Sequence, residues 1–396
     1  MGAITMTLSI ALNNIGKKAW LGGIQYLHNL IRAVRTLPRD EQPDLALLLS
    51  AWDADPAMHA DVAQLVDMVI AYPTEAASPW IALRRRAKQF ASRRPYLTYS
   101  RVFKQKHVNA FFPLTQIPDY PLDVNWIAWA WDLQHKHLPD YFSAPEIARR
   151  DAVFTAMAER APLIVTSSHD ALEDFDRFYP GARTRLRVLN FATPPLPEWY
   201  AADVNAVCAK YNLPEKFLAM PNTFWIHKNH RLAFEAIREL ALNKVEVCVV
   251  CTGGTHDSRR PEYFSEIQKY VAENHLENHI RILGVLPRHD QLQIMRASCA
   301  VLQPSLFEGW STVVEDARAL GKAIILSDIG VHREQNPPKA IFFDPHCVES
   351  LVSAINLSWN DLAAGPNLKD EEIARQGQIA NVQTFARRFI EIASER

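Results

Sequence analysis

Short apolar runs alternate with longer amphipathic stretches from one end of the chain to the other. Each run is short enough to be a buried strand of a parallel sheet, because such strands are covered on both faces. In the first half the runs lie at residues 4–12, 46–52, 68–72, 108–114, 124–132, 163–167 and 186–191. In the second half they lie at residues 217–220, 245–251, 280–283, 300–302, 323–326 and 340–343. The alternation predicts an α/β protein with doubly wound parallel sheets.

The segments between the runs carry helical signals. Residues 24–34 and 373–392 have apolar side chains at helical spacing, and Ser168 or Asp170 is placed to cap a helix. Residues 192–199 contain three prolines, which indicates an extended linker. We therefore place the domain boundary at this linker.

The bulk composition is that of a globular protein. A chain of 396 residues is long enough for two domains with separate cores. With 48% hydrophobic residues, 22% charged residues and a net charge of -1, a disordered or nucleic-acid-coating protein is disfavoured. No apolar run approaches the ~18 to 20 residues of a membrane span, and residues 1–12 read as a first strand because they lack the basic leader and cleavage site of a signal peptide.

The cysteines point to a reducing compartment, because there are five of them without regular spacing. Cys248 and Cys251 form a C-x-x-C pair inside a strand pattern, and no second pair accompanies them. We therefore expect buried thiols at these positions and not a zinc or redox site.

The most informative stretch is residues 299–335, CAVLQPSLFEGWSTVVEDARALGKAIILSDIGVHREQ. It reads as a strand, a loop with Glu308, a helix capped by Ser311 or Thr312 and stopped by Gly321, and a second strand. In a parallel sheet this order places the free N–H groups of a helix N-terminus at a crevice where anionic ligands bind.

Two acids lie in the first turns of that helix. At about 100° per residue, Glu315 lies roughly opposite the apolar face and is expected to point toward solvent. Asp316 lies on the flank of the helix, where its side chain can reach the crevice. Acids near a helix N-terminus also favour the helix dipole without binding any ligand, so both interpretations stay open.

This stretch resembles the donor-sugar signature of the retaining family 4 glycosyltransferases, which have the GT-B fold. The resemblance is carried by Glu308-Gly309-Trp310, Asp316-Ala317 and Gly321-Lys322-Ala323. In that family a glutamate, seven residues and a second glutamate recur, and here the spacing leads to Asp316, which is one methylene shorter. The resemblance implies that Glu308 contacts the donor sugar, that amides of residues 309–311 contact its hydroxyls or the phosphates, and that Asp316 contacts the ribose diol.

A second loop of the same family holds the donor diphosphate with an arginine and a lysine. Lys228 matches the lysine, whereas Thr223 stands where the arginine usually lies, and His227 or His230 could share its task. Residues 284–287 resemble the turn whose backbone reads the nucleobase. The resemblance thus assigns donor binding to Asn222, Thr223, His227, Lys228, Leu286, Gly309, Trp310, Ser311, Thr312 and Asp316.

The first half contributes further candidates. Gly22 and Gly23 fall where a strand hands over to a helix, although no G-x-G-x-x-G dinucleotide fingerprint is present. They are either a simple loop with a glycine N-cap or the paired glycine with which family members approach donor phosphate or acceptor. Relatives often carry a histidine near the donor sugar where this chain has Trp131, and His135 or His137 would replace it as a catalytic group.

Residues 82–94 form a basic amphipathic stretch. It is either a solvated helix face or a surface that meets anionic lipid. The second interpretation would suit a cytoplasmic enzyme that is peripheral on the inner face of the plasma membrane. No nucleic-acid partner is expected, because neither half of the chain is strongly basic.

The resemblance implies two Rossmann-like domains that face each other across a cleft. Residues 1–191 would bind the acceptor, residues 192–376 would bind the nucleotide sugar, and a helix at 377–396 would pack back on the first domain. The reaction would move a sugar, with its anomeric configuration retained, from a UDP- or GDP-sugar to a hydroxyl of a glycan or lipid-linked acceptor. No cofactor and no metal are expected besides the nucleotide sugar, because Lys228 and helix N-termini would stabilise the leaving diphosphate.

The resemblance is to transferases of bacterial polysaccharide and lipopolysaccharide synthesis. Two other functions stay open. A sugar-nucleotide-binding protein without transferase activity would bind nucleotide without turnover, and a nucleotide-sugar epimerase of the same architecture would form its product without an acceptor.

Overall fold

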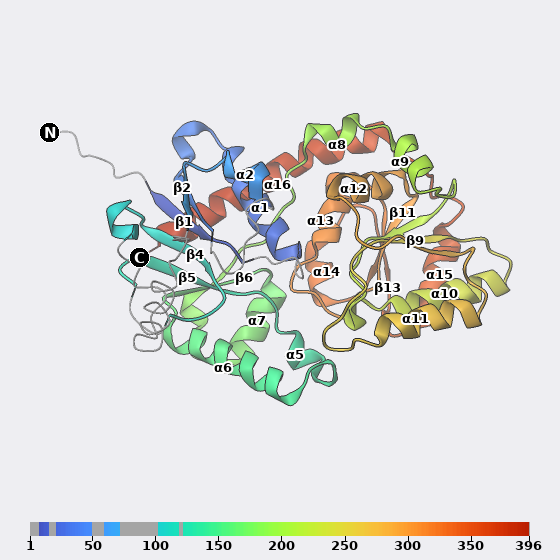
Figure 1. Cartoon of the computed structure of the whole chain (residues 1–396), viewed down its shortest axis with the longest axis horizontal. Coiled ribbons are helices and arrows are strands. Elements are labelled where there is room, and N and C mark those ends of the chain that lie inside the picture. Colours follow the sequence, from blue (N-terminus) through green and yellow to red (C-terminus); the bar gives the residue numbers. More distant parts are fainter. Residues whose placement is uncertain (1–7, 16–20, 50–58, 72–101, 119–121, 396) are drawn as a thin grey trace, which may run out of the picture. The chain divides into compact units, whose positions relative to one another are not determined.

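The computed structural model describes residues 8–15, 21–49, 59–71, 102–118 and 122–395. These residues form two compact units, each built on one parallel β-sheet with helices on its faces (Figure 1). Unit 1 comprises Met1–Leu133, Ala148–Ala192 and Asn381–Arg396, and unit 2 comprises Gln134–Ile147 and Thr193–Ala380. The predicted fold class, α/β with two Rossmann-like domains, is confirmed.

Unit 1 contains a seven-stranded sheet within the described residues, in the order β3-β2-β1-β4-β5-β6-β7. Its strands are β1 (Ser9–Asn13), β2 (Asp44–Leu49), β3 (Met68–Ala71), β4 (Ala110–Leu114), β5 (Asn125–Ala130), β6 (Leu163–Thr166) and β7 (Leu186–Val188). Its main helices are α1 (Leu21–Arg35), α2 (Ala60–Ala63), α6 (Ala144–Arg160) and α7 (His169–Phe178). The Ser168 hydroxyl accepts a hydrogen bond from the Ala171 amide, so Ser168 is the N-cap of α7.

Unit 2 contains a six-stranded sheet in the order β10-β9-β8-β11-β12-β13 among the described residues. The strands are β8 (Leu218–Met220), β9 (Val249–Cys251), β10 (Ile280–Ile282), β11 (Ala300–Gln303), β12 (Ile324–Ser327) and β13 (Ala340–Phe343). The helices are α5 (Gln134–His137), α8 (Pro197–Ala201), α9 (Val204–Lys210), α10 (His230–Leu242), α11 (Tyr263–Glu273), α12 (Arg288–Ala297), α13 (Thr312–Ala319), α14 (Gly330–Gln335), α15 (Val348–Ser358) and the first part of α16 (Leu368–Ser394). From Asn381 on, α16 belongs to unit 1.

Alternation along the strands of unit 2 builds two cores, one on each face of the sheet. Leu218 and Met220 of β8 join the core under α10, α11 and α15, whereas Ala219 joins the core under α9, α12 and α13 (Figure 1). Because side chains of a strand point to opposite faces in turn, a strand buried on both faces must be apolar throughout. Each predicted apolar run accordingly overlaps a strand of the structure. Residues 4–7, 50–52 and 72 of those runs lie outside the described residues.

The cysteines are free thiols. Cys251 is buried at the end of β9, and Cys248 is buried directly before the strand. The prediction of buried thiols in a strand is therefore confirmed. Burial raises the pKa of the Cys248 thiol to about 11, which keeps it protonated at neutral pH.

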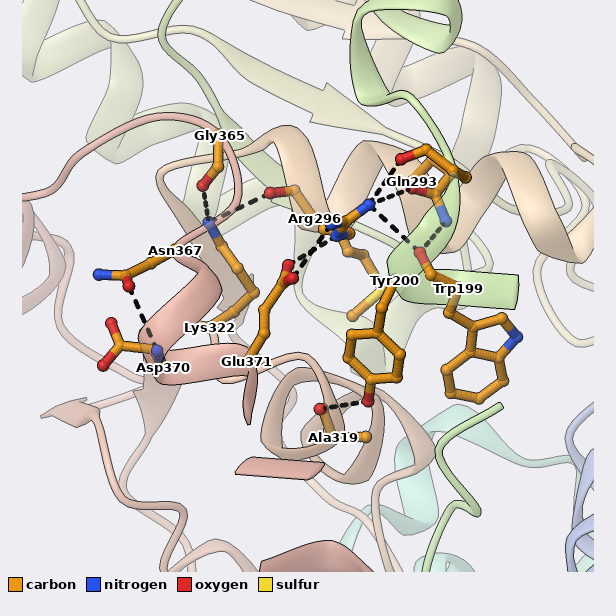
Figure 2. Close-up of polar contacts among 12 residues, drawn as sticks. Trp199, Tyr200, Gln293, Arg296, Ala319, Lys322, Gly365, Asn367, Asp370 and Glu371 are labelled. Carbon is orange, nitrogen blue, oxygen red and sulfur yellow. Dashed lines mark hydrogen bonds and ion pairs between the residues drawn. The ribbon is translucent and has the colours of Figure 1, made fainter. Parts of the chain in front are cut away.

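A buried polar cluster of unit 2 contacts the segment by which the chain enters this unit and also α16, by which the chain leaves it (Figure 2). The Arg296 guanidinium of α12 donates to Glu371 of α16 at 2.6 and 3.0 Å. The same guanidinium donates to the main-chain oxygens of Trp199 and Ala202, which belong to the segment entering unit 2. One charged pair thus ties the start of α16 to the start of the domain.

Gly321 also allows close packing against the start of α16. It ends α13 with a φ of +62°, and a Cβ at this position would lie 2.6 Å from the main-chain oxygen of Asp370. The conformation and the close approach both require glycine. Lys322, the next residue, donates to the main-chain oxygen of Gly365 (Figure 2). It also donates to the main-chain oxygen of Ser298.

The Arg296–Glu371 pair yields a prediction for stability. Glu371→Leu leaves a guanidinium buried without its counter-charge, which should destabilise unit 2 by ~3 to 5 kcal/mol. The double variant Arg296→Met/Glu371→Leu removes both charges and should be less destabilised than the single one. Urea unfolding followed by tryptophan fluorescence measures both, with Asp328→Asn, which breaks an exposed pair with Arg333, as a control that should barely move the midpoint. A double variant as unstable as Glu371→Leu would contradict this account.

Candidate functional site

The loops that follow β8 and β11 meet at the carboxyl edge of the unit 2 sheet, because these two strands are neighbours at its centre. In a parallel sheet this edge is where ligands bind. The loop after β8 carries Asn222 and Lys228, and the loop after β11 carries Glu308. The structure brings these three predicted site residues together.

Lys228 and Glu308 form an ion pair, with Nζ 2.6 Å from Oε1. Their side chains are only 14% and 10% exposed, so both charges are largely withdrawn from water. Lys228 is the last residue of a single 3-10 turn, Ile226–Lys228, and Asn229 after it adopts a φ of 58° that redirects the chain into α10. Sequence reasoning named both residues but assigned them to different parts of the donor, and their pairing is a tertiary finding.

Gln303 is a site residue that sequence reasoning missed. It is fully buried at the carboxyl end of β11, and its Nε2 donates to Glu308 Oε1 at 2.8 Å. Its Oε1 accepts from Asn222 Nδ2 at 2.7 Å. The signal in the sequence was a single amide ending an otherwise apolar strand, which packing does not require.

The two oxygens of Glu308 are treated differently. Lys228 Nζ and Gln303 Nε2 both contact Oε1, and within the described part of the chain no hydrogen bond or ion pair goes to Oε2. A carboxylate held by one oxygen presents the other to a ligand. Hydroxyl groups are suitable donors to it.

His332 of α14 is a second buried group near this pair that sequence reasoning did not single out. Its Nδ1 donates to the main-chain oxygen of Ser327 at 2.9 Å, so the neutral ring has an unprotonated Nε2. That Nε2 has no hydrogen-bond partner among the described residues. Burial lowers the pKa of His332 to about 4 although the Glu308 charge opposes this, so the ring is neutral at neutral pH.

Helix α13 begins beside Glu308, as predicted, with Ser311 as its N-cap residue. The Ser311 hydroxyl does not cap the helix but accepts from Gln303 Nε2 at 3.1 Å. The Ser311 amide donates to Gln335 Oε1, so this amide, expected to contact the donor, is already engaged inside the unit. Gly309, Trp310 and Thr312 around it are half-buried.

The expectation that Glu315 faces solvent is wrong. Its side chain is 3% exposed and accepts hydrogen bonds from Nε2 of Gln335 and Nε2 of Gln378, with Arg318 nearby. The face opposite the apolar stripe is covered by α14 and α16, which bring amide side chains to it. Burial raises the pKa of Glu315.

Asp316 is buried as well, at 1% exposed, so it lies deeper than a flank position suggested. Its Oδ1 accepts from Arg288 Nη2 at 2.6 Å and from the Thr193 hydroxyl at 3.2 Å. Arg288 opens α12, directly after the turn at 284–287 in which Leu286 is half-buried. The acid expected at the ribose therefore lies beside the turn expected at the base, with its charge already paired.

The loop after β8 is braced by Arg259 from the loop after β9. Arg259 pairs with buried Asp257, approaches His227 Nδ1 at 3.3 Å and donates to Gln134 Oε1 at 2.6 Å. Asp257 in turn accepts from the Ile226 amide. A guanidinium thus stands next to the loop in which Thr223 occupies the place of the expected arginine. His227 is buried and contacts it.

Two other features of this loop decide its shape. His230 is fully buried in the first turn of α10 and stacks on Phe224 with ring centroids 3.9 Å apart, so it belongs to the core and not to the phosphate site. Gly253 has a φ of +131°, and a Cβ there would lie 2.5 Å from the main-chain oxygen of Asn222. Only glycine allows the β9 loop to approach the β8 loop this closely.

The two candidate histidines lie in α5, in the segment Gln134–Ile147 that belongs to unit 2 and not, as the expected boundaries had it, to the first domain. His135 is buried, and its ring lies edge-on to Phe142. His137 is exposed and lies against Phe307, with ring centroids 5.2 Å apart, next in sequence to Glu308. Of the two, only His137 is exposed, and it lies against the residue that precedes Glu308.

The remaining candidates lie elsewhere. Gly22 and Gly23 are in the first turn of α1 in unit 1, where the strand hands over to the helix as predicted. The basic stretch 82–94 lies outside the described residues. The sequence also contains two Asp-x-Asp triplets, a spacing that can bind a metal ion. Residues 53–55 lie outside the described residues, and Asp174 and Asp176 lie on α7 of unit 1.

The described residues contain neither a candidate metal site nor a candidate membrane span. No group of three or more histidine, cysteine, aspartate and glutamate side chains gathers to hold a metal ion in this part of the chain. No helix in it is both long enough and apolar enough to cross a bilayer.

Solved structures share this architecture over nearly the whole chain. A glycosyltransferase from Rickettsia africae aligns with a TM-score of 0.66 and 15% identity, over 99% of this chain and 100% of that one. HepE from Anabaena, solved in complex with UDP and glucose, aligns with a TM-score of 0.70 and 16% identity, over 97% and 99%. Sucrose-phosphate synthase from Thermosynechococcus elongatus aligns with a TM-score of 0.60 and 17% identity, over 98% and 96%.

The family comparison concerns the part of unit 2 that carries the Lys228–Glu308 pair. Residues 209–370 match the family described as "Glycosyl transferases group 1". No curated protein matches the chain. The solved structures show the fold, and the family match shows that residues 209–370 resemble a glycosyltransferase domain. The chain therefore has the GT-B fold, and residues 209–370 within it match the group 1 glycosyl transferases.

Proposed function

We propose that the protein transfers a glycosyl group from a UDP- or GDP-sugar to a hydroxyl of a glycan or lipid-linked acceptor, with retention of configuration and without a required metal. The observation that carries the proposal is the Lys228–Glu308 pair, withdrawn from water at the carboxyl edge of the unit 2 sheet beside the N-terminus of α13. The Anabaena neighbour was solved with UDP and glucose and with UDP-glucose, which supports a UDP-sugar donor.

The charges of the site suit a leaving diphosphate. As the bond from the anomeric carbon to the diphosphate oxygen breaks, its electron pair stays on that oxygen. Lys228 and the N–H groups in the first turn of α13 would donate hydrogen bonds to the developing charge. The acceptor oxygen bonds the same carbon, and its proton passes to the released diphosphate. In this scheme Lys228 does the work that a metal ion would otherwise do.

Glu308 and His137 would orient the sugar. Glu308 Oε2 is the carboxylate oxygen left for a sugar hydroxyl, and His137 stands against Phe307 one residue away. Between the candidate histidines, we propose His137 as the catalytic group because His135 is buried. Asp316 remains the proposed ribose contact, with Arg288 as its partner.

A donor panel tests the proposal directly. A ligand present at ~100 times its Kd stabilises its protein by about 2.7 kcal/mol, so UDP, GDP and their sugars can be ranked by thermal shift. The best donors are then assayed for turnover with and without acceptor. Tight nucleotide binding without turnover would favour a binding protein, and product formed without acceptor would favour an epimerase.

Lys228→Ala should weaken UDP binding by removing a charge-assisted contact worth ~1.5 to 3 kcal/mol, which is tenfold or more in Kd. Binding of uridine, which has no phosphate, should stay within threefold. Calorimetric titration of both ligands checks this. Equal losses for UDP and uridine would show that Lys228 supports the loop and not the diphosphate.

Glu308→Gln should lower kcat/KM at least tenfold, about 1.4 kcal/mol of transition-state stabilisation, because the charged oxygen that orients the sugar is lost. The melting temperature should change little, since size and shape are kept. Glu315 is unsuitable as a control because it is buried and hydrogen-bonded, so the exposed Glu277 serves instead. If Glu277→Gln lowers kcat/KM as much as Glu308→Gln does, the role given to Glu308 is wrong.

Attachment to the inner face of the plasma membrane is a further part of the proposal, and it rests on the sequence of the basic stretch 82–94. Each engaged arginine or lysine contributes ~1 kcal/mol at an anionic surface. Wild-type protein should co-sediment with phosphatidylserine vesicles at low salt, and replacing Arg84, Arg85 and Arg86 by glutamate should abolish this. Co-sedimentation that ignores both salt and charge reversal would refute membrane attachment through this stretch.

A further inference from the structure

We infer that Gln303 is the positioning residue that holds Glu308 in place when Lys228 turns to the donor diphosphate. The inference rests on the proposed function, because it needs a diphosphate at Lys228. Its starting point is that Lys228 Nζ and Gln303 Nε2 contact the same oxygen of Glu308, at 2.6 and 2.8 Å.

Lys228 is not a permanent partner for Glu308 during a reaction. A diphosphate carries more negative charge than one carboxylate and competes for the same ammonium group. The more strongly Lys228 engages the donor, the less it restrains Glu308. A side chain that must orient a sugar at that moment needs a second restraint that the donor does not attract away.

Gln303 meets that requirement by its chemistry and its anchoring. A neutral amide has little reason to follow a phosphate, and Gln303 is fully buried at the end of a central strand. Its carbonyl oxygen accepts from Asn222 Nδ2, which fixes the amide so that Nε2 faces Glu308. The same Nε2 lies 3.1 and 3.2 Å from the hydroxyls of Ser311 and Ser305. The residues at the ends of β8 and β11 thus fix the direction in which the Gln303 side-chain amide donates.

Further neutral hydrogen bonds hold the loop between Gln303 and Glu308. The Ser327 hydroxyl donates to the main-chain oxygen of Ser305, and Ser327 also accepts from His332 Nδ1. The loop that carries Glu308 is therefore tied to β12 and α14 by neutral hydrogen bonds. None of these restraints depends on Lys228.

Gln303→Leu tests the inference, with the donor identified by the panel as substrate. It should lower kcat tenfold or more while the Kd for UDP stays within threefold, because Lys228 and not Gln303 binds the diphosphate. The matched control is Gln293→Leu, which removes another fully buried glutamine of unit 2 whose Nε2 donates to the Trp199 main-chain oxygen. The control should lower the melting temperature to a similar extent and change kcat less than threefold.

Gln303→Glu keeps the shape and supplies a readout that a purely structural role would not move. Two carboxylates at 2.8 Å repel each other when both are charged and share a proton when one is not. The variant should lose at least tenfold in kcat/KM at pH 8 and recover part of it toward pH 6, where the shared proton restores a hydrogen bond to Glu308. Wild-type activity should not rise in that direction.

The outcomes are separable. If the wild type turns over no UDP- or GDP-sugar, the proposed function falls and this inference with it. If the wild type is active but Gln303→Leu matches Gln293→Leu in kcat, only the inference is overturned. Should Gln303→Leu fail to fold, Gln303→Glu decides, and an activity lost equally at pH 6 and pH 8 overturns the inference.

Discussion

The ion pair between Lys228 and Glu308 is the interaction around which the site in unit 2 is arranged. Removing two charges from water costs several kcal/mol, and their attraction rarely returns more than that, so such a pair is a poor device for stability. It persists here because neighbouring groups satisfy it: Gln303 donates to the same carboxylate oxygen, and Asn222 holds Gln303. A ligand with phosphate and hydroxyl groups can use both charges, which apolar packing cannot offer.

Unit 2 contains a second buried pair, Arg296 and Glu371, and the comparison shows how a structural cluster differs from a site. Both oxygens of Glu371 accept from Arg296, and the guanidinium also donates to main-chain oxygens (Figure 2). Among the described residues, Glu308 is held through Oε1 alone, at the carboxyl edge of the sheet. The closed cluster anchors the start of α16, whereas the incomplete one has an oxygen left for a ligand.

The prediction that Glu315 faces solvent is wrong for a physical reason. Helical angles describe one helix against one apolar core, whereas α13 is also covered by α14 and α16. Those helices bring Gln335 and Gln378, whose amides satisfy a buried carboxylate without an opposite charge. A polar residue on the face opposite the core is therefore not always at the surface in a sheet protein with several helical layers.

The strand series, the class of fold and the helix after Glu308 could be predicted from the sequence, because apolar periodicity and turn chemistry are local and act on neighbouring residues. Lys228 and Glu308 were proposed as site residues only from the family resemblance of their loops. The tertiary structure decided what no local pattern contains. It paired Lys228 with Glu308 across 80 residues, brought Gln303 between Asn222 and Glu308, and attached His137 to unit 2. Each of these depends on which strands become neighbours in the sheet, and that is set by the packing of the whole domain.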